Sequence, residues 1–315
     1  MTCNFASNLK ITRDYDGLLA RALATRRQVV AYALNVSLTG SGILAASTTG
    51  SKAAAFSTVA SADGTKVAFE RRGSGPALVL IGGALNDRTM ATPLAELLKG
   101  DFTVYTYDRR GRGDSTDTAP YAVEREVEDL AALIGKLAAP VLVFGHSSGA
   151  ILALEAAAAK LPIARLAVYE PPFELDAKAA MQSAAFADDV AAKLKDGARE
   201  EAVMFFLDGT GMPPAMITDV KKSPMWPIFI SVAPTLNYDL ALVRNGGDSY
   251  VPAERIKTIV VPVLAMAGGE SPNFMKQAAQ AVAKAAPHGR YQEIAGQTHH
   301  APPEIVAPLL KAYFK

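Results

Sequence analysis

The amino-acid sequence predicts an α/β fold, in which helices cover both faces of a mostly parallel central sheet. From Phe56 onward, short apolar runs alternate with longer stretches of helical periodicity. Several of the runs are apolar at nearly every position, which is typical of parallel strands that are buried on both faces. Residues 171–255 contain no clear buried strand and are predicted to form a helical insertion on the sheet.

The expected elements follow one another in chain order. Strands are expected at Lys66–Phe69, Ala77–Ile81, Thr103–Tyr107, Val141–Phe144, Ala164–Tyr169, Val260–Ala267 and Tyr291–Ile294. Helices are expected at Ala91–Leu98, Val123–Leu137, Ala150–Ala159, Phe274–Ala286 and Pro303–Phe314. Within the insertion, helical stretches are expected at Ala177–Lys195 and Glu200–Leu207, followed by loops rich in glycine and proline.

The first 55 residues have the order of an export signal. Arg26 and Arg27 precede a weakly apolar stretch, and Ala53–Ala55 follow it. The two adjacent arginines make the segment resemble a twin-arginine signal, with cleavage near Ala55 and an exported, periplasmic or secreted product. The alternative is a poorly ordered or surface-docked amphipathic helix on a cytoplasmic protein. The stretch is too polar for a stable membrane span.

Composition excludes several classes of partner. The 315 residues carry a net charge of +1, so no electrostatic feature points to nucleic acid or to an anionic membrane surface. Cys3 is the single cysteine, which excludes an intrachain disulfide and a cysteine-based zinc site.

The motif GHSSG at residues 145–149 predicts a nucleophilic serine. It matches G-x-S-x-G and lies between an expected strand and an expected helix. The flanking glycines allow the sharp turn that such a serine needs. The spacing selects Ser147 as the nucleophile, and Ser148 supplies a backbone N–H at a helix N-terminus, where partial positive charge favours a developing oxyanion.

With this motif the chain resembles the α/β-hydrolase family from about Ser61 to Lys315. VLIGGALNDR resembles the oxyanion loop of the family, and YDRRGRGDS resembles the loop after its fourth strand. GQTHHAPPEIVAPLL resembles the histidine loop and the last helix. The resemblance implies an α/β-hydrolase core formed by residues 56–170 and 256–315, with a helical cap at residues 171–255. It also implies a serine hydrolase that needs no metal or organic cofactor.

The resemblance assigns the general base. The family's Gly-x-x-His pattern falls on Gly296 and His299, so His299 would take the proton of the serine hydroxyl. His300 is the alternative. His146 lies within the serine motif, and its side chain is expected to point away from that of Ser147.

The resemblance also assigns the oxyanion hole to the backbone N–H groups of Ser148 and Ala84. The chain has Gly82-Gly83 where His-Gly is common in the family, which leaves open how the oxyanion loop is braced. The charged residues of YDRRGRGDS are expected to form a structural ion-pair network that holds their loop: Asp108, Arg109, Arg110, Arg112 and Asp114.

The acid of the triad departs from the family pattern. The usual position, in the turn after the strand that follows the cap, holds Ser271. Three carboxylates remain open as replacements: Glu170, Glu270 and Asp248. Glu170 is favoured because it ends the strand after the nucleophile's helix, where lactone hydrolases similar to zearalenone hydrolases place a glutamate. An acid orients the histidine and stabilises its charged form.

The cap is rich in methionine and aromatic residues, which form adaptable apolar walls or the core of the insertion itself. The candidates for the substrate pocket are Trp226, Met225, Phe229 and Gly83. Trp226 is expected in a loop, SPMWPIF. The resulting hypothesis is hydrolysis of a carboxylic ester or lactone of a moderately apolar small molecule. The alternatives are a carbon–carbon bond hydrolase, a perhydrolase, an acyltransferase and a non-catalytic binding protein.

Overall fold

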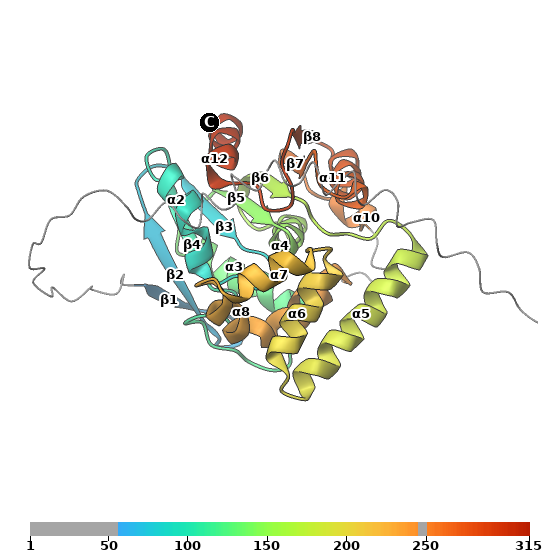
Figure 1. Cartoon of the computed structure of the whole chain (residues 1–315). Helices are drawn as coiled ribbons and strands as arrows, with labels where there is room; N and C mark the ends of the chain where they lie inside the picture. The colour runs from blue at the N-terminus through green and yellow to red at the C-terminus, as the bar shows by residue number, and fades with distance from the viewer. Residues whose placement is uncertain (1–55, 245–250) are drawn as a thin grey trace, which may run out of the picture. The chain divides into compact units, whose positions relative to one another are not determined.

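The structure, a computed structural model, describes residues 56–244 and 251–315, and its centre is an eight-stranded sheet (Figure 1). The strand order is β1-β2-β4-β3-β5-β6-β7-β8. All pairs from β4 to β8 are parallel, while β1 and β2 are antiparallel to their neighbours. The strands are β1 Ser57–Ala60, β2 Lys66–Arg72, β3 Ala77–Ile81, β4 Thr103–Tyr107, β5 Val141–His146, β6 Ile163–Tyr169, β7 Val263–Gly268 and β8 Gly289–Ile294.

The expected mostly parallel sheet is therefore confirmed, although several strand bounds differ by one to three residues and one strand was not expected. Strand β7 begins at Val263 rather than Val260. Val260 is 68% exposed, and Pro262 has no N–H to donate to a neighbouring strand. Strand β1 was not expected, because Val59 is its one buried residue and four such residues give no clear apolar pattern.

Both faces of the sheet are buried, as its apolar strands require. In β3, Val79 packs into the layer formed with α3, α4 and α11, whereas Leu78 and Leu80 pack into the layer formed with α2 and α12. Alternate side chains of a strand point to opposite faces, so one apolar run serves both layers. The helices are α2 Thr92–Leu98, preceded by the 3₁₀ turn η1 Arg88–Ala91, α3 Val123–Ile134, α4 Ser148–Ala158, α10 Ala253–Ile256, α11 Asn273–Ala285 and α12 Pro303–Phe314.

Helices also form the insertion between β6 and β7, and they share an apolar cluster of their own (Figure 1). The expected glycine- and proline-rich loops are wrong in part, because α7, α8 and η2 each carry a proline in the first turn, where its missing N–H costs nothing. Trp226 begins α8 instead of lying in a loop. The elements are α5 Ala177–Lys195, α6 Arg199–Gly209, α7 Pro214–Lys221, α8 Trp226–Val232, η2 Ala233–Thr235 and α9 Leu236–Val243.

Two predictions fall outside the described residues. The export segment at residues 1–55 and the carboxylate of Asp248 both lie there, and they stay predictions. Across residues 56–244 and 251–315, no helix combines the length and the apolar character that crossing a membrane requires.

Candidate active site

Ser147 occupies a strained turn between β5 and α4. Its backbone angles are φ 57° and ψ −127°, a region that residues with a side chain rarely adopt. The flanking glycines make this turn possible. A Cβ on Gly145 would lie 2.4 Å from the carbonyl oxygen of Gly149, and a Cβ on Gly149 would lie 2.5 Å from that of Ile81. The turn presents Ser147 at the N-terminal end of α4, as the motif predicts.

The oxyanion loop after β3 lies directly against this serine. A Cβ on Gly83 would lie 2.8 Å from Cβ of Ser147 and 3.3 Å from its Oγ, so only a glycine fits here without a shift. The next two residues, Ala84 and Leu85, pack against the apolar cluster of the insertion. Ser148, the first residue of α4, has a backbone N–H that no turn of the helix can use. The oxyanion loop, which carries Ala84, and Ser148 at the start of α4 thus both adjoin Ser147.

Glu170 pairs with His299 at the end of β6. Its Oε2 lies 2.6 Å from Nδ1 of His299, and its Oε1 accepts a 2.7 Å hydrogen bond from the backbone N–H of Gly268. The side chain is fully buried, and the residue has a positive φ of 49°. Both carboxylate oxygens are therefore held, and the charge faces the imidazole.

The environment of Glu170 favours its ionised form. Burial raises its pKa, but the contacts with His299, Ser271 and Gly268 lower it by more, so the pKa lies below its usual value of 4.5. The buried Ser271 hydroxyl lies beside the carboxylate without the geometry of a full hydrogen bond. With an ionised acceptor at Nδ1, His299 carries a proton on that nitrogen and leaves Nε2 free to act as a base.

Three consecutive carbonyl groups hold the loop that carries His299. The carbonyl of Gln297 accepts from the backbone N–H of Glu270 at 2.9 Å, and that of Thr298 accepts from the hydroxyl of Tyr169 at 2.6 Å. The carbonyl of His299 lies 2.9 Å from Nε2 of His146. These three contacts hold the backbone at His299 and at the two residues before it, which positions the imidazole.

The other two histidines of the site adjoin His299. The ring of His146 lies 4.7 Å from that of His299, and the ring of His300 lies 5.3 Å from it, centre to centre. His300 is an exposed residue, yet the protein atoms around its imidazole, together with the neighbouring His299, lower its pKa to about 4. Among the described residues, no group of three or more His, Cys, Asp or Glu side chains is arranged to hold a metal ion.

The alternative acid and the pocket candidates lie in different surroundings. Glu270 is exposed, and its recorded contact with the histidine loop is the backbone bond to Gln297. Phe229 is buried in the apolar cluster of the insertion, and Trp226 packs against that cluster. Met225 precedes α8 and is 36% exposed.

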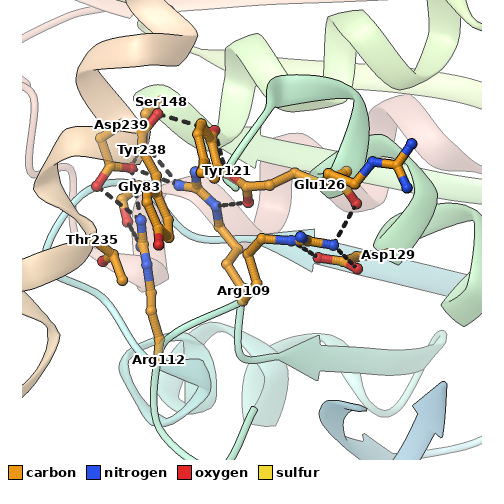
Figure 2. A network of polar contacts seen from close by, with 12 residues as sticks. Gly83, Arg109, Arg112, Tyr121, Glu126, Asp129, Ser148, Thr235, Tyr238 and Asp239 are labelled. Carbon is orange, nitrogen blue, oxygen red and sulfur yellow. Dashed lines mark hydrogen bonds and ion pairs between the residues drawn. The ribbon is translucent and has the colours of Figure 1, made fainter. Parts of the chain in front are cut away.

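The arginines of the loop after β4 form ion pairs, as expected, and two of them pair with a residue that was not expected in the network. Arg110 pairs with Asp129, and Arg109 pairs with Glu126. Arg109 and Arg112 both pair with Asp239 of α9, a residue that the sequence did not single out (Figure 2). No local motif marks Asp239, since it lies 127 positions from Arg112 in the chain.

Comparison with known proteins agrees with this fold. The model of the alpha/beta hydrolase family matches residues 78–308, which is more than half of the chain. The chain therefore belongs to the alpha/beta hydrolase family.

Individual relatives support the same assignment. An alpha/beta hydrolase from Sphaerobacter thermophilus DSM 20745 is 47% identical, with a TM-score of 0.75 over 82% of this chain and 100% of that chain. A thermophilic esterase from Thermogutta terrifontis is 22% identical, with a TM-score of 0.64 over 83% and 98%, which is a likeness of fold alone. The uncharacterized hydrolase YraK of Bacillus subtilis (strain 168) is 36% identical over 96 residues, 29% of this chain and 35% of that protein. The match thus spans about a third of that curated relative's length.

Proposed function

We propose that the chain is a serine hydrolase that cleaves a carboxylic ester or lactone of a moderately apolar small molecule. The observation that carries the proposal is the 2.6 Å contact between Glu170 and His299, on a loop that contacts His146, the residue before the strained turn at Ser147. A serine hydroxyl is a weak nucleophile until a base takes its proton, and a base is effective when a third group orients it.

The first half of the reaction forms an acyl-enzyme. Nε2 of His299 takes the proton of Ser147 while Oγ attacks the carbonyl carbon, and the carbonyl oxygen becomes an oxyanion. The N–H groups of Ala84 and Ser148 donate to that oxyanion. The tetrahedral species then breaks the bond to the leaving oxygen, which takes the proton from His299 and departs as an alcohol. In a lactone the leaving alcohol stays attached to the acyl group.

The second half returns the enzyme to its starting state. Water replaces the alcohol, gives a proton to His299, and attacks the acyl carbon, with the same two N–H groups holding the oxyanion. Ser147 leaves as the alcohol, recovers its proton from His299, and the carboxylic acid is released. Glu170 keeps the imidazole in one tautomer and stabilises its positive charge in both halves.

The apolar character of the substrate follows from the insertion. The cluster that contains Phe229 and Trp226 also contacts Ala84, so an apolar wall borders the oxyanion loop. Ligand sites typically combine such walls with a few oriented polar groups. We propose Trp226, Met225, Phe229 and Gly83 as the residues nearest the acyl or alcohol group.

The test is a comparison of labelling and turnover with the full chain. A fluorophosphonate probe is expected to modify Ser147, located by peptide mass spectrometry, and p-nitrophenyl esters and lactones of increasing size are expected to be hydrolysed. Ser147→Ala, which has lost the nucleophile, is expected to do neither. Turnover of lactones is followed by acid release, since ring opening yields a hydroxy acid.

Other outcomes point to other members of the fold. A wild type that neither reacts with the probe nor hydrolyses any ester contradicts the proposal and favours a binding protein. Labelling of Ser147 without ester or lactone turnover favours a carbon–carbon bond hydrolase or a perhydrolase instead.

A further inference from the structure

Behind the oxyanion loop lies a buried cluster of four charged side chains, which we name the brace: Arg109, Arg112, Glu126 and Asp239 (Figure 2). Each of the four is at most 2% exposed. Two guanidinium groups face two carboxylates, so the charges balance. Such a buried set persists only when its members are mutually paired and hydrogen bonded, and here each ion pair is 2.6 to 2.8 Å long.

One arm of the brace holds the first oxyanion donor. Nη1 of Arg112 donates to the carbonyl oxygen of Gly83 at 2.6 Å and to that of Asn86 at 3.2 Å. The carbonyl of Gly83 and the N–H of Ala84 belong to the same peptide group. In a trans peptide these two bonds point in opposite directions, so fixing the carbonyl toward Arg112 fixes the N–H away from it. In the described part of the chain no protein group accepts a hydrogen bond from this N–H.

The same contact strengthens the donor that it orients. A guanidinium charge on the carbonyl oxygen draws electron density through the peptide group, and hydrogen bonds linked in this way polarise one another. The N–H of Ala84 therefore becomes a better donor for a negatively charged oxygen. The bond from Arg112 thus braces the oxyanion loop, at a place where the chain has Gly82-Gly83 and not His-Gly.

A second arm of the brace reaches the other donor. Oδ1 of Asp239 accepts a 2.6 Å hydrogen bond from the hydroxyl of Ser148, and Nη1 of Arg109 lies 3.2 Å from the same hydroxyl. Asp239 also accepts two 2.8 Å bonds from Arg112. A single carboxylate thus connects the residue that carries one oxyanion donor with the arginine that fixes the other (Figure 2).

The charge of Asp239 is stable at neutral pH. Burial raises its pKa, but Arg112, Arg109 and the Ser148 hydroxyl lower it by more, so the pKa lies below the usual value of 3.8. Asp239 lies on α9, within the insertion, whereas Arg112 lies in the loop after β4 and Ser148 begins α4. The link between the two donors is consequently supplied by the cap.

We propose that Arg112 and Asp239 are positioning residues for the oxyanion hole, and that the hole is complete only when the cap contributes Asp239. The proposal rests on the proposed serine hydrolysis. Arg112 and Asp239 touch no reacting atom; they act through the peptide groups at Gly83-Ala84 and at Ser148. Their loss lowers the rate of the chemical step more than it weakens binding of the substrate in its ground state.

The test compares Arg112→Lys with Arg110→Lys in the full chain. Both arginines are at most 1% exposed and paired, but Arg110 binds Asp129, Asp63 and the carbonyl of Arg125, outside the oxyanion loop. Lysine keeps the charge and loses the planar fork that contacts both Gly83 and Asp239. Melting temperature, kcat and KM for a p-nitrophenyl ester, and the inhibition constant of a trifluoromethyl ketone are measured for each variant.

For Arg112→Lys, kcat is expected to fall about 10- to 100-fold with KM changed less than about 3-fold. The inhibition constant of the ketone, which forms an oxyanion on Ser147, is expected to rise by the factor by which kcat/KM falls. Arg110→Lys is expected to lower the melting temperature and to leave kcat and the inhibition constant unchanged. Equal kinetic effects in the two variants would assign the brace to stability alone and overturn the proposal.

A second variant decides the question if Arg112→Lys does not fold. Ser148→Ala keeps the backbone N–H and a residue that suits a helix, and removes only the hydroxyl with its contacts to Asp239 and Arg109. Its kcat is expected to fall about 10-fold at unchanged KM, and wild-type kcat overturns the proposal. A wild type without ester or lactone hydrolysis and without probe labelling overturns the proposed function itself, and this proposal with it.

Discussion

Glu170 and His299 meet through a 2.6 Å contact although they lie 129 positions apart in the chain. We predict that Glu170→Gln keeps the shape of the side chain and lowers kcat by about 10³- to 10⁴-fold, because a neutral amide neither fixes the tautomer nor stabilises the charged imidazole. Steady-state kinetics with a p-nitrophenyl ester measure the loss. Glu270→Gln is the matched control and should retain wild-type kcat, since Glu270 is exposed. Full activity in Glu170→Gln would remove Glu170 from the proposed triad.

The sequence predicts the parts of this site that depend on local chemistry. The turn at Ser147 follows from two glycines at fixed spacing, and strand β3 follows from five consecutive apolar residues, Ala77–Ile81. Placement of Glu170 at the end of β6 brings it near the histidine loop after β8, because β6, β7 and β8 are parallel and end at the same edge of the sheet.

The sequence does not predict the parts that depend on packing between distant segments. Asp239 is an ordinary acidic residue on a short helix, and only the folded chain brings it to Arg112 and Ser148. In the same region the proline Pro227 suggests a loop, whereas it occupies the first turn of α8. A proline in the sequence indicates the boundary of a helix but does not distinguish the end of one helix from the first turn of the next.

The close approach of Gly83 to Ser147 makes a second prediction. Gly83→Ala places a Cβ 2.8 Å from Cβ of Ser147, so the nucleophile or the oxyanion loop must move. A displacement of this kind is expected to lower kcat about 100-fold. Gly82→Ala is the control, because the three atoms nearest to its Cβ all belong to the Asn86 side chain, the closest at 3.2 Å. Equal kcat values for the two variants, measured at saturating ester, would show that the approach at Gly83 has no role in catalysis.

The backbone strain at Ser147 should be visible as a gain in stability. With φ at 57° and ψ at −127°, the residue pays a conformational cost of about 1 kcal/mol or more that glycine avoids. We expect Ser147→Gly to melt about 2–4 °C above Ser147→Ala, with both variants inactive. Comparison of these two inactive variants removes any contribution of the hydroxyl. If the alanine variant melts at the higher temperature, the turn is not strained in solution.

His146 provides a prediction for the dependence of stability on pH. Its imidazole keeps some solvent contact, yet burial lowers its pKa well below 6.5, and the nearby His299 lowers it further. The imidazole therefore binds a proton near pH 6.5 in the unfolded chain but not in the folded chain. The free energy of unfolding consequently falls as the pH drops below this value. For one proton the slope approaches about 1.4 kcal/mol per pH unit.

His146→Gln tests this linkage. Glutamine keeps an N–H that can donate to the carbonyl of His299, but it does not titrate. The slope of the unfolding free energy against pH, between pH 6.5 and pH 5, should therefore decrease by up to the contribution of one bound proton. Urea unfolding at a series of pH values measures the slope. His288→Gln changes an exposed histidine just before β8, at the opposite end of that strand from the histidine loop; it is the control and should follow the wild type. Parallel curves for wild type and His146→Gln would mean that His146 binds its proton equally well in the folded and the unfolded chain, which would contradict a lowered pKa in the folded protein.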